Sequence, residues 1–164
     1  MAIKINIGTL NDGAQQLEFI SDSKEIGFDK ELLKDKLLIS IDLFKAAHQL
    51  DLRIKLTGIM RLACDRCLEI YEMPFEKDFE LVLVQKAQRE EAYSDDYIRT
   101  YSSFMQTVDI TNDIKEYFLL AIPMRKVPPE TDAGVCTWCG KTKEYWQSLI
   151  NSPADNPPEA DKEI

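Results

Sequence analysis

The chain has 164 residues, which is enough for one domain with its own hydrophobic core. Its content of 45% hydrophobic and 30% charged residues, with only six glycines, argues against collagen-like, low-complexity and fully disordered classes. Because 20 basic residues face 29 acidic ones, a formal net charge of −9 disfavours bulk electrostatic binding to a phosphate backbone.

The N-terminal residues lack the basic and apolar pattern of a secretory leader, and no stretch approaches the roughly 18 apolar residues of a membrane span. We therefore expect a cytoplasmic protein with no membrane contact. Four cysteines in a reducing compartment indicate metal binding or thiol chemistry rather than disulfides.

The N-terminal third alternates between apolar and polar residues. Isoleucines recur at 3, 5 and 7, and apolar residues return at 17–20 after an Asn11-Asp12-Gly13 turn, which predicts a pair of strands. Residues 21–35 are charged and turn-prone, and we expect a loop with one helical turn there. Period-two alternation is clearest over 37–43 and 50–56, and it predicts two antiparallel strands that pair with each other.

A third apolar run over 59–64 leads to the first cysteine pair, and another strand is expected over 75–83. Residues 85–100 carry too much charge for a core element, so we expect an exposed loop. From Asp109 the apolar spacing becomes helical, which predicts a helix near 110–122 that Asp109 caps, Pro123 ends and the sheet packs against.

A short helix is expected over 142–150, with Tyr145, Trp146 and Leu149 pointing inward. The predicted class is α+β, with a mainly antiparallel sheet that is also compatible with a barrel-like closure. We expect a single domain over 1–150 and a flexible acidic tail over 151–164.

The cysteines form two Cys-x-x-Cys pairs, Cys64/Cys67 and Cys136/Cys139. Two residues between paired cysteines let a tight turn aim both sulfurs at one ion, and structural zinc prefers four such ligands. Gly140 suits the second pair because a residue without a Cβ can adopt the positive φ that follows such a turn. The pattern predicts one structural zinc per chain in a knuckle that includes the C-terminal segment.

The 68 residues between Cys67 and Cys136 are far more than a compact zinc ribbon contains. The site would therefore join the sheet to the C-terminal segment. Four thiolates with Zn²⁺ carry a charge of about −2, which nearby cations could offset, or these cations could contact a phosphate. They are Arg61, Arg66, Lys141 and Lys143.

Two other interpretations of the cysteines stay open. They could be reduced, metal-free thiols that pack as small hydrophobic groups. They could also be a redox dithiol, although neither pair follows a strand and opens a helix as a thioredoxin site does. Trp138 and the neighbouring cations could form a patch that stacks on RNA, or they could be ordinary core and surface residues.

No catalytic constellation is evident. The only histidine, His48, lies in a predicted turn, and the acidic pairs Glu90-Glu91 and Asp95-Asp96 lie in the charged loop. The sequence has no Gly-rich phosphate loop, nucleophile elbow or His-Glu-x-x-His helix. We therefore expect a protein that is not an enzyme and has no small-molecule substrate.

Four blocks over residues 35–140 resemble the YceD family, whose members are linked to accumulation or processing of 23S ribosomal RNA in bacteria and plastids. The second block opens the predicted helix and the third closes it, and the Cys-x-Arg-Cys-Leu motif of the first is the most specific. The blocks are Ala63-Cys64-Asp65-Arg66-Cys67-Leu68-Glu69, Asp109-Ile110, Leu119-Leu120-Ala121-Ile122-Pro123 and Gly134-Val135-Cys136-Thr137-Trp138-Cys139-Gly140.

The resemblance implies a non-enzymatic ribosome-biogenesis factor that supports 23S rRNA accumulation or large-subunit assembly. Its partner would be ribosomal RNA or a large-subunit assembly intermediate, contacted directly or through a ribosomal protein. The alternative is an interaction module that binds a basic ribosomal protein or assembly factor without touching RNA. The chain departs from many members by lacking a further cysteine near 127–129. The residues that the resemblance carries over are Cys64, Arg66, Cys67, Cys136, Cys139 and Gly140.

Overall fold

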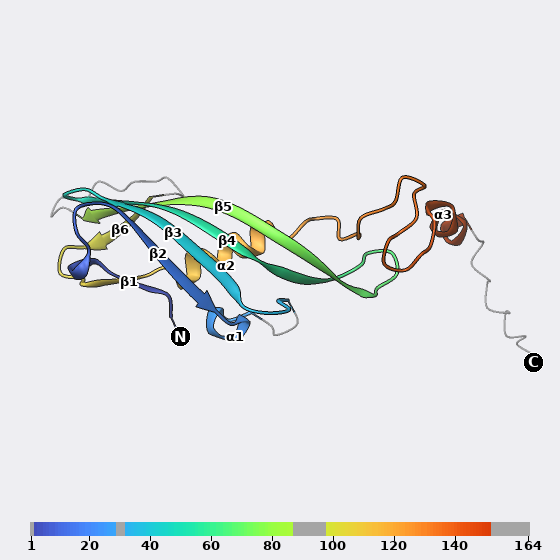
Figure 1. Ribbon diagram of the computed structural model, residues 1–164, viewed down its shortest axis with the longest axis horizontal. Coiled ribbons are helices and arrows are strands. Elements are labelled where there is room, and N and C mark those ends of the chain that lie inside the picture. The colour runs from blue at the N-terminus through green and yellow to red at the C-terminus, as the bar shows by residue number, and fades with distance from the viewer. Residues whose placement is uncertain (1, 29–31, 87–97, 152–164) are drawn as a thin grey trace, which may run out of the picture.

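The computed structural model describes residues 2–28, 32–86 and 98–151. It contains two sheets, three helices and one 3-10 turn within these residues (Figure 1). The strands are β1 (Lys4–Asn6), β2 (Gly13–Ser21), β3 (Leu37–Lys45), β4 (Gln49–Ala63), β5 (Ile70–Lys86), β6 (Ile98–Ser102) and β7 (Thr107–Asp109). The helices are α1 (Ser23–Ile26), α2 (Thr111–Ala121) and α3 (Lys143–Asn151), and η1 (Ile7–Thr9) is the 3-10 turn.

The larger sheet has five strands in the order β2-β3-β4-β5-β6, with antiparallel pairing from β2 to β5 and a parallel β6 at one edge. The predicted α+β class and mainly antiparallel sheet are confirmed. A barrel does not form, because β2 and β6 remain separate edges of the described sheet. No helix among the described residues is long and apolar enough to cross a membrane.

The N-terminal strands do not pair with each other, so that prediction was wrong. β1 pairs with β7, placing Ile5 opposite Val108, whereas β2 pairs with β3. Alternation shows which face of a strand is buried but does not identify the neighbouring strand. The single helical turn expected within 21–35 is confirmed as α1, with Asp22 and Glu25 forming its capping box.

The predicted hairpin of β3 and β4 is confirmed, with Leu43 opposite Leu52. The apolar run over 59–64 is a continuation of β4 rather than a separate strand. Gly58 lies in this strand opposite Phe75, and a Cβ at position 58 would come within 3.0 Å of the Phe75 ring. The missing side chain leaves room for Phe75 in the core.

The predicted loop over 85–100 was wrong at both ends: β5 extends to Lys86, and Ile98 begins β6, where it lies opposite Val82. Positions 87–97 lie outside the described residues. Only a neighbouring strand could reveal β6, because its half-buried residues, Ile98 and Tyr101, are three positions apart and do not alternate.

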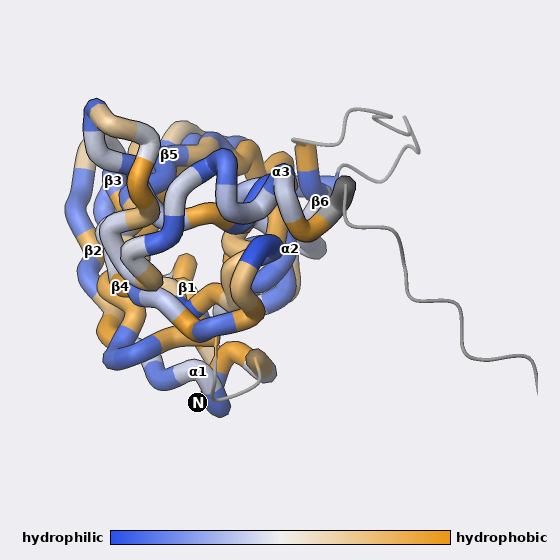
Figure 2. Tube along the Cα trace, turned by 90° about the vertical axis from the view of Figure 1, so that its right-hand side faces the viewer, coloured by the Kyte–Doolittle hydropathy of each residue, from blue (hydrophilic) through white to orange (hydrophobic). Residues whose placement is uncertain are grey.

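The predicted helix near 110–122 is confirmed as α2, and it packs on the sheet as expected. Its N-cap is Ile110 rather than the predicted Asp109, whose carboxylate accepts the N–H of Thr111, the first helical residue, at 2.9 Å. The fully buried ring of Phe118 lies 4.4 Å from that of Phe28 and 5.2 Å from that of Phe75, measured between centroids. Figure 2 looks along the long axis and shows β2 to β5 around one side of the core, with α1, α2 and β1 on the other. The core therefore lies between the sheet and α2.

Beyond Leu38, which pairs with Thr57, β4 and β5 continue without β3 as a long ribbon, which residues 32–34 join near its base through the bridge of Leu33 with Met60. The ribbon carries its connecting turn away from the core and toward α3 (Figure 1). Tyr145 and Leu149 of α3 are exposed, so the prediction that they point inward was wrong, whereas Trp146, the third residue of that prediction, is half-buried. The predicted tail beyond Asn151 lies outside the described residues.

Candidate metal centre

The first cysteine pair forms the turn at the tip of the β4–β5 ribbon, which we call the first knuckle (64–69). The Leu68 N–H donates to the Cys64 carbonyl at 2.9 Å, and the Cys64 N–H donates to the Glu69 carbonyl at 2.9 Å. The Arg66 N–H points at the Cys64 sulfur from 3.4 Å. Leu68 has a φ of 61°, in the left-handed region that favours glycine.

The second cysteine pair, in the second knuckle (136–141), repeats this hydrogen-bond pattern. The Gly140 N–H donates to the Cys136 carbonyl at 2.9 Å, and the Cys136 N–H donates to the Lys141 carbonyl at 3.0 Å. The backbone N–H groups of Trp138 and Cys139 point at the Cys136 sulfur. Gly140 has a φ of 69°, so it occupies the position and conformation that Leu68 has in the first knuckle.

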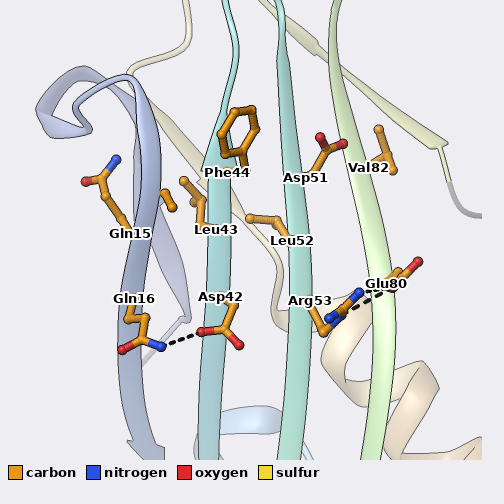
Figure 3. Close-up of a pocket in the computed structure, with 11 residues that line it drawn as sticks. Gln15, Gln16, Asp42, Leu43, Phe44, Asp51, Leu52, Arg53, Glu80 and Val82 are labelled. Carbon is orange, nitrogen blue, oxygen red and sulfur yellow. Dashed lines mark hydrogen bonds and ion pairs between the residues drawn. The ribbon is translucent and has the colours of Figure 1, made fainter.

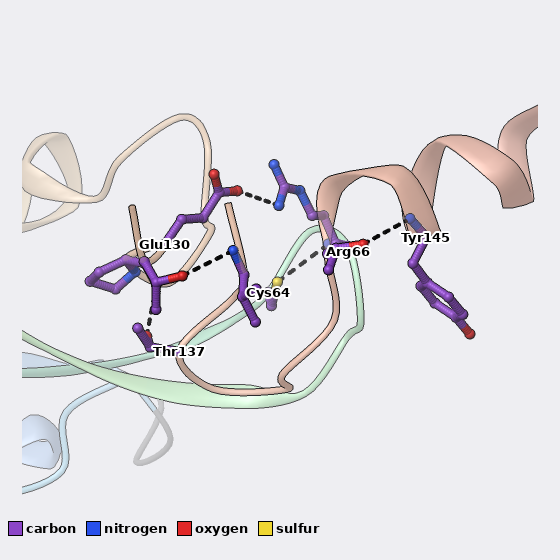
Figure 4. Close-up of polar contacts among 9 residues, drawn as sticks. Cys64, Arg66, Glu130, Thr137 and Tyr145 are labelled. Carbon is purple, nitrogen blue, oxygen red and sulfur yellow. Dashed lines mark hydrogen bonds and ion pairs between the residues drawn. The ribbon is translucent and has the colours of Figure 1, made fainter. Parts of the chain in front are cut away.

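Contacts from the intervening segment bring the two knuckles side by side (Figure 4). The Asp65 N–H donates to the Lys126 carbonyl at 2.8 Å, and the Asp65 carboxylate accepts the Lys126 N–H at 2.7 Å. Arg66 forms an ion pair with Glu130, which in turn forms a β-bridge with Cys136. These contacts bring together two cysteine pairs that 68 residues separate in the sequence. We call the two knuckles, together with Lys126 and Glu130 that join them, the clasp.

The sulfurs of the four cysteines are neighbours inside the clasp. Cys64 and Cys136 are buried, while Cys67 and Cys139 are half-buried. Cys67 interacts with the thiols of Cys64 and Cys139, and Cys136 interacts with the thiol of Cys139. Within the described residues, however, no three Cys, His, Asp or Glu side chains form a group that could hold a metal ion as they stand. The thiol contacts run in a chain from Cys64 through Cys67 and Cys139 to Cys136, without a common centre.

The environment has opposite effects on two of the thiols. Burial raises the pKa of Cys67, and the neighbouring Cys64 and Cys139 thiols add to this effect. Burial also acts to raise the pKa of Cys136. The N–H groups of Cys139 and Trp138, with the charge of Arg66, outweigh it and hold the pKa of Cys136 below its usual value.

The chemistry of the donor set limits the class of metal that this site would take. Four cysteine sulfurs in two turns, with N–H groups aimed at sulfur, are the ligands and the surroundings that Zn²⁺ or an iron–sulfur centre uses. Cys64, Cys67, Cys136 and Cys139 would be the ligands of such an ion if their four sulfurs closed around one centre. An ion with four protein ligands has no open position for water or substrate, so its role would be to cross-link the ribbon and the C-terminal segment.

The predicted cations around the cysteines are largely engaged within the protein. Arg66 pairs with Glu130, and the Lys141 ammonium lies 4.7 Å from the centroid of the Tyr145 ring. Arg61 lies 3.9 Å from the Glu72 carboxylate. Lys143 lines a shallow hollow with Arg125. Of the four, only Arg66 contributes its charge to a described cysteine pKa shift.

The structure also places the two other candidate residues of the sequence, Trp138 and His48. Half-exposed Trp138 faces a hollow of about 230 Å³ that Arg61, Ile70 and Glu72 also line. His48 precedes β4 at the end opposite the first knuckle, and its Nδ1 lies 2.9 Å from the Gln85 amide oxygen.

Sequence reasoning missed the residues that close the clasp, namely Asp65, Lys126 and Glu130. No local pattern identifies them, because each acts on a partner more than 60 positions away. Leu68 left a signal that could have been found. It follows its cysteine pair at the same offset as Gly140, which predicts the same backbone conformation.

The comparisons with known proteins agree with the resemblance noted in the sequence. A family model described as large ribosomal RNA subunit accumulation protein YceD matches residues 52–157. This span contains both knuckles, the ribbon that carries the first of them, and α2. No curated protein and no solved structure matches the chain.

Proposed function

The chain belongs to the YceD family, and on that premise we propose that it is a non-enzymatic ribosome-biogenesis factor that supports 23S rRNA accumulation and large-subunit assembly in the cytoplasm. The observation that carries this proposal is the family match over residues 52–157, because the family is described by the accumulation of large-subunit ribosomal RNA. The match includes the clasp, so the clasp belongs to the part of the chain that the family shares.

We also propose that Cys64, Cys67, Cys136 and Cys139 bind one structural zinc per chain. The matched hydrogen-bond patterns of the two knuckles support it, as do their placement side by side and the N–H groups aimed at sulfur. When bound, zinc supplies a cross-link between the tip of the ribbon and the segment that leads to α3. The protein residues align the two turns through Asp65, Arg66 and Glu130.

A role without catalysis is supported by the chemistry of the hollows. One hollow, of about 730 Å³, has a described lining of β2 to β5 residues that includes no histidine, cysteine or serine. General acid–base or nucleophilic chemistry needs an activated group beside a base, and this lining offers acidic residues, glutamines and one arginine that is already paired.

Sucrose-gradient fractionation of cells that lack the protein tests the ribosomal role. The deletion should lower the large-subunit peak and the ratio of 23S to 16S rRNA, and the wild-type gene should restore both. A variant with Cys64→Ser and Cys136→Ser should restore them only in part, because the clasp is weakened. A normal gradient and a normal rRNA ratio in the deletion strain would exclude the proposed function.

A second candidate is the interaction module that binds a basic ribosomal protein or assembly factor without direct RNA contact. The observation that favours it is the acidic balance of the chain, with a formal net charge of −9. Pull-down from nuclease-treated extracts at low and high salt separates the two candidates. A basic protein that stays bound after RNA is removed, and is released by salt, supports the second. Recovery that depends on intact RNA supports direct RNA binding.

A further inference from the structure

The five-stranded sheet has one face that no other described element covers. Alternate residues of β3 and β4, such as Ile41 and Ile54, point into the core on the inner face. The residues between them point the other way, and with their neighbours on β2 and β5 they form what we call the outer face. A hollow of about 730 Å³ lies on this face between β2 and β5 (Figure 3).

Acidic residues predominate on the outer face. Over the stretch where β3 pairs with β4, its two cations are engaged, because Arg53 pairs with Glu80 at 3.0 Å and Lys55 pairs with Glu76 at 2.6 Å. Register places the acidic side chains on neighbouring strands, so their charges add over a continuous surface. The acidic residues of this face are Glu18, Asp42, Asp51, Glu76, Asp78 and Glu80.

Two carboxylates at the hollow have no cationic partner among the described residues. Asp42 accepts a hydrogen bond from the Gln16 amide at 2.8 Å, and Asp51 accepts one from the Gln49 amide at 2.6 Å. Arg53 lies directly opposite Asp42 in the sheet, yet its guanidinium pairs with Glu80. Both carboxylates can therefore accept further hydrogen bonds from a cation of another molecule.

An exposed aromatic ring lies beside one of these carboxylates, that of Asp51, and on the same strand as the other. Phe44 is 51% exposed, follows Asp42 by two positions on β3 and lies directly opposite Asp51 on β4. Figure 3 shows the three side chains around the same hollow, with Val82 on the neighbouring strand. A planar cation that stacks on the ring would have the Asp51 carboxylate directly across from it and the Asp42 carboxylate two positions along β3.

From this arrangement we infer that the hollow docks an arginine side chain of a basic polypeptide, with the guanidinium stacked on Phe44 and hydrogen-bonded to Asp42 and Asp51. Arginine fits better than lysine because its flat fork of donors can stack and bind carboxylates together. The acidic surroundings oppose RNA, since phosphates would approach a surface of like charge. The inference rests on the proposed function only for the expectation that the partner is a protein of the assembling large subunit.

The test uses the full-length protein and a short synthetic peptide of alternating arginine and valine, followed by fluorescence anisotropy and NMR chemical-shift mapping. Replacing arginine in the peptide by citrulline, which keeps the shape and removes the charge, should weaken binding about tenfold. Phe44→Ala should weaken it about threefold to fivefold, and Asp42→Asn with Asp51→Asn about tenfold. Shifts should centre on β3 and β4.

Matched controls lie on the same face outside the hollow. Asp78→Asn removes one of the outer-face carboxylates and Leu38→Ala truncates a partly exposed apolar side chain, and both should change binding less than about twofold. Equal weakening by Asp78→Asn would overturn the inference, because the attraction would then be diffuse. It would also be overturned if the Asp42 and Asp51 variant bound normally, or if single-stranded RNA bound this hollow instead of the peptide.

Failure of this inference can be told apart from failure of the proposed function. Peptide binding is measured on the purified protein, whereas the ribosomal role is measured by gradients from deletion cells. Normal gradients with specific peptide binding would remove the ribosomal role and leave the docking site. Defective gradients with no effect of the Phe44, Asp42 and Asp51 substitutions on peptide binding would do the reverse.

Discussion

Arg66 and Glu130 are 64 positions apart in the sequence, and their side chains form an ion pair at the centre of the clasp. The Arg66 side chain is 15% exposed and that of Glu130 is 26% exposed, so this pair is less exposed than that of Arg53 with Glu80. Glu130 also forms a β-bridge with Cys136, and Arg66 precedes Cys67. The pair therefore aligns one cysteine turn with the other through protein contacts alone, without a metal ion.

Removing this ion pair should destabilise the clasp more than removing an exposed one. We expect Arg66→Gln to lower the free energy of unfolding by about 2 kcal/mol, because Glu130 keeps a partly buried charge with no partner. Arg53→Gln is the control: its pair with Glu80 is 69% and 68% exposed and should contribute less than about 0.5 kcal/mol. Urea unfolding of both variants measures the difference, and equal effects would contradict it.

Zinc should accompany the four cysteines in protein purified without added metal. Elemental analysis should find about one zinc per chain, and Cys136→Ser should lose the zinc together with part of the thermal stability. Thr100→Ser, at an exposed position of β6, should keep both. Wild-type protein that contains no zinc and melts at the same temperature as the Cys136→Ser variant would rule out the metal centre.

Leu68 and Gly140 have nearly the same backbone conformation, with φ of 61° and 69°. A leucine is strained there and a glycine is not, so Leu68→Gly should raise the free energy of unfolding by about 0.5 to 1 kcal/mol. Gly140→Leu should lower it by about 1 kcal/mol, because a Cβ there meets no atom within 4 Å and only the backbone cost remains. Thermal unfolding of both proteins checks the signs.

A stabilising effect of Leu68→Gly would have a consequence for function. The Leu68 side chain is 78% exposed, so it contributes little to the core. A strained and exposed leucine that lowers stability would be retained for contacts outside the fold. No gain in stability would show that local packing of Leu68 offsets the backbone strain.

Asp109 should stabilise α2 in a pH-dependent way. Hydrogen bonds from Thr111, including its N–H at 2.9 Å, hold the pKa of Asp109 below its usual value. Because the folded pKa lies below the unfolded one of about 3.9, this contribution is complete above that pH and is lost as pH falls through the folded pKa.

We therefore expect Asp109→Ala to lower the free energy of unfolding by about 1 kcal/mol at neutral pH. The difference from wild type should shrink when both proteins are measured by denaturant unfolding below about pH 4. Asp12→Ala, at an exposed position before β2, should have a small effect at neutral pH. A penalty for Asp109→Ala that stays constant into acid would show that its charge is not responsible.

Elements with a clear periodic spacing of apolar residues were predicted correctly from the sequence. Period-two alternation in β3 and β4 specified both the strands and their buried faces, because side chains of a strand alternate sides. The spacing that buries Ile114 and Phe118 specified α2 for the corresponding helical reason. β6 was missed and β1 was paired wrongly, because a short strand depends on its neighbour for identity.

What the sequence determined by itself about the candidate site was its donor set: two Cys-x-x-Cys pairs, with a glycine after the second in the position where the turn needs positive φ. Only the tertiary structure decided that the pairs lie side by side, since this depends on the ribbon of β4 and β5 and on contacts of Asp65 and Arg66 with distant residues. Local patterns encode backbone conformation within a few residues, whereas contacts between distant segments follow from how the whole chain buries its apolar surface.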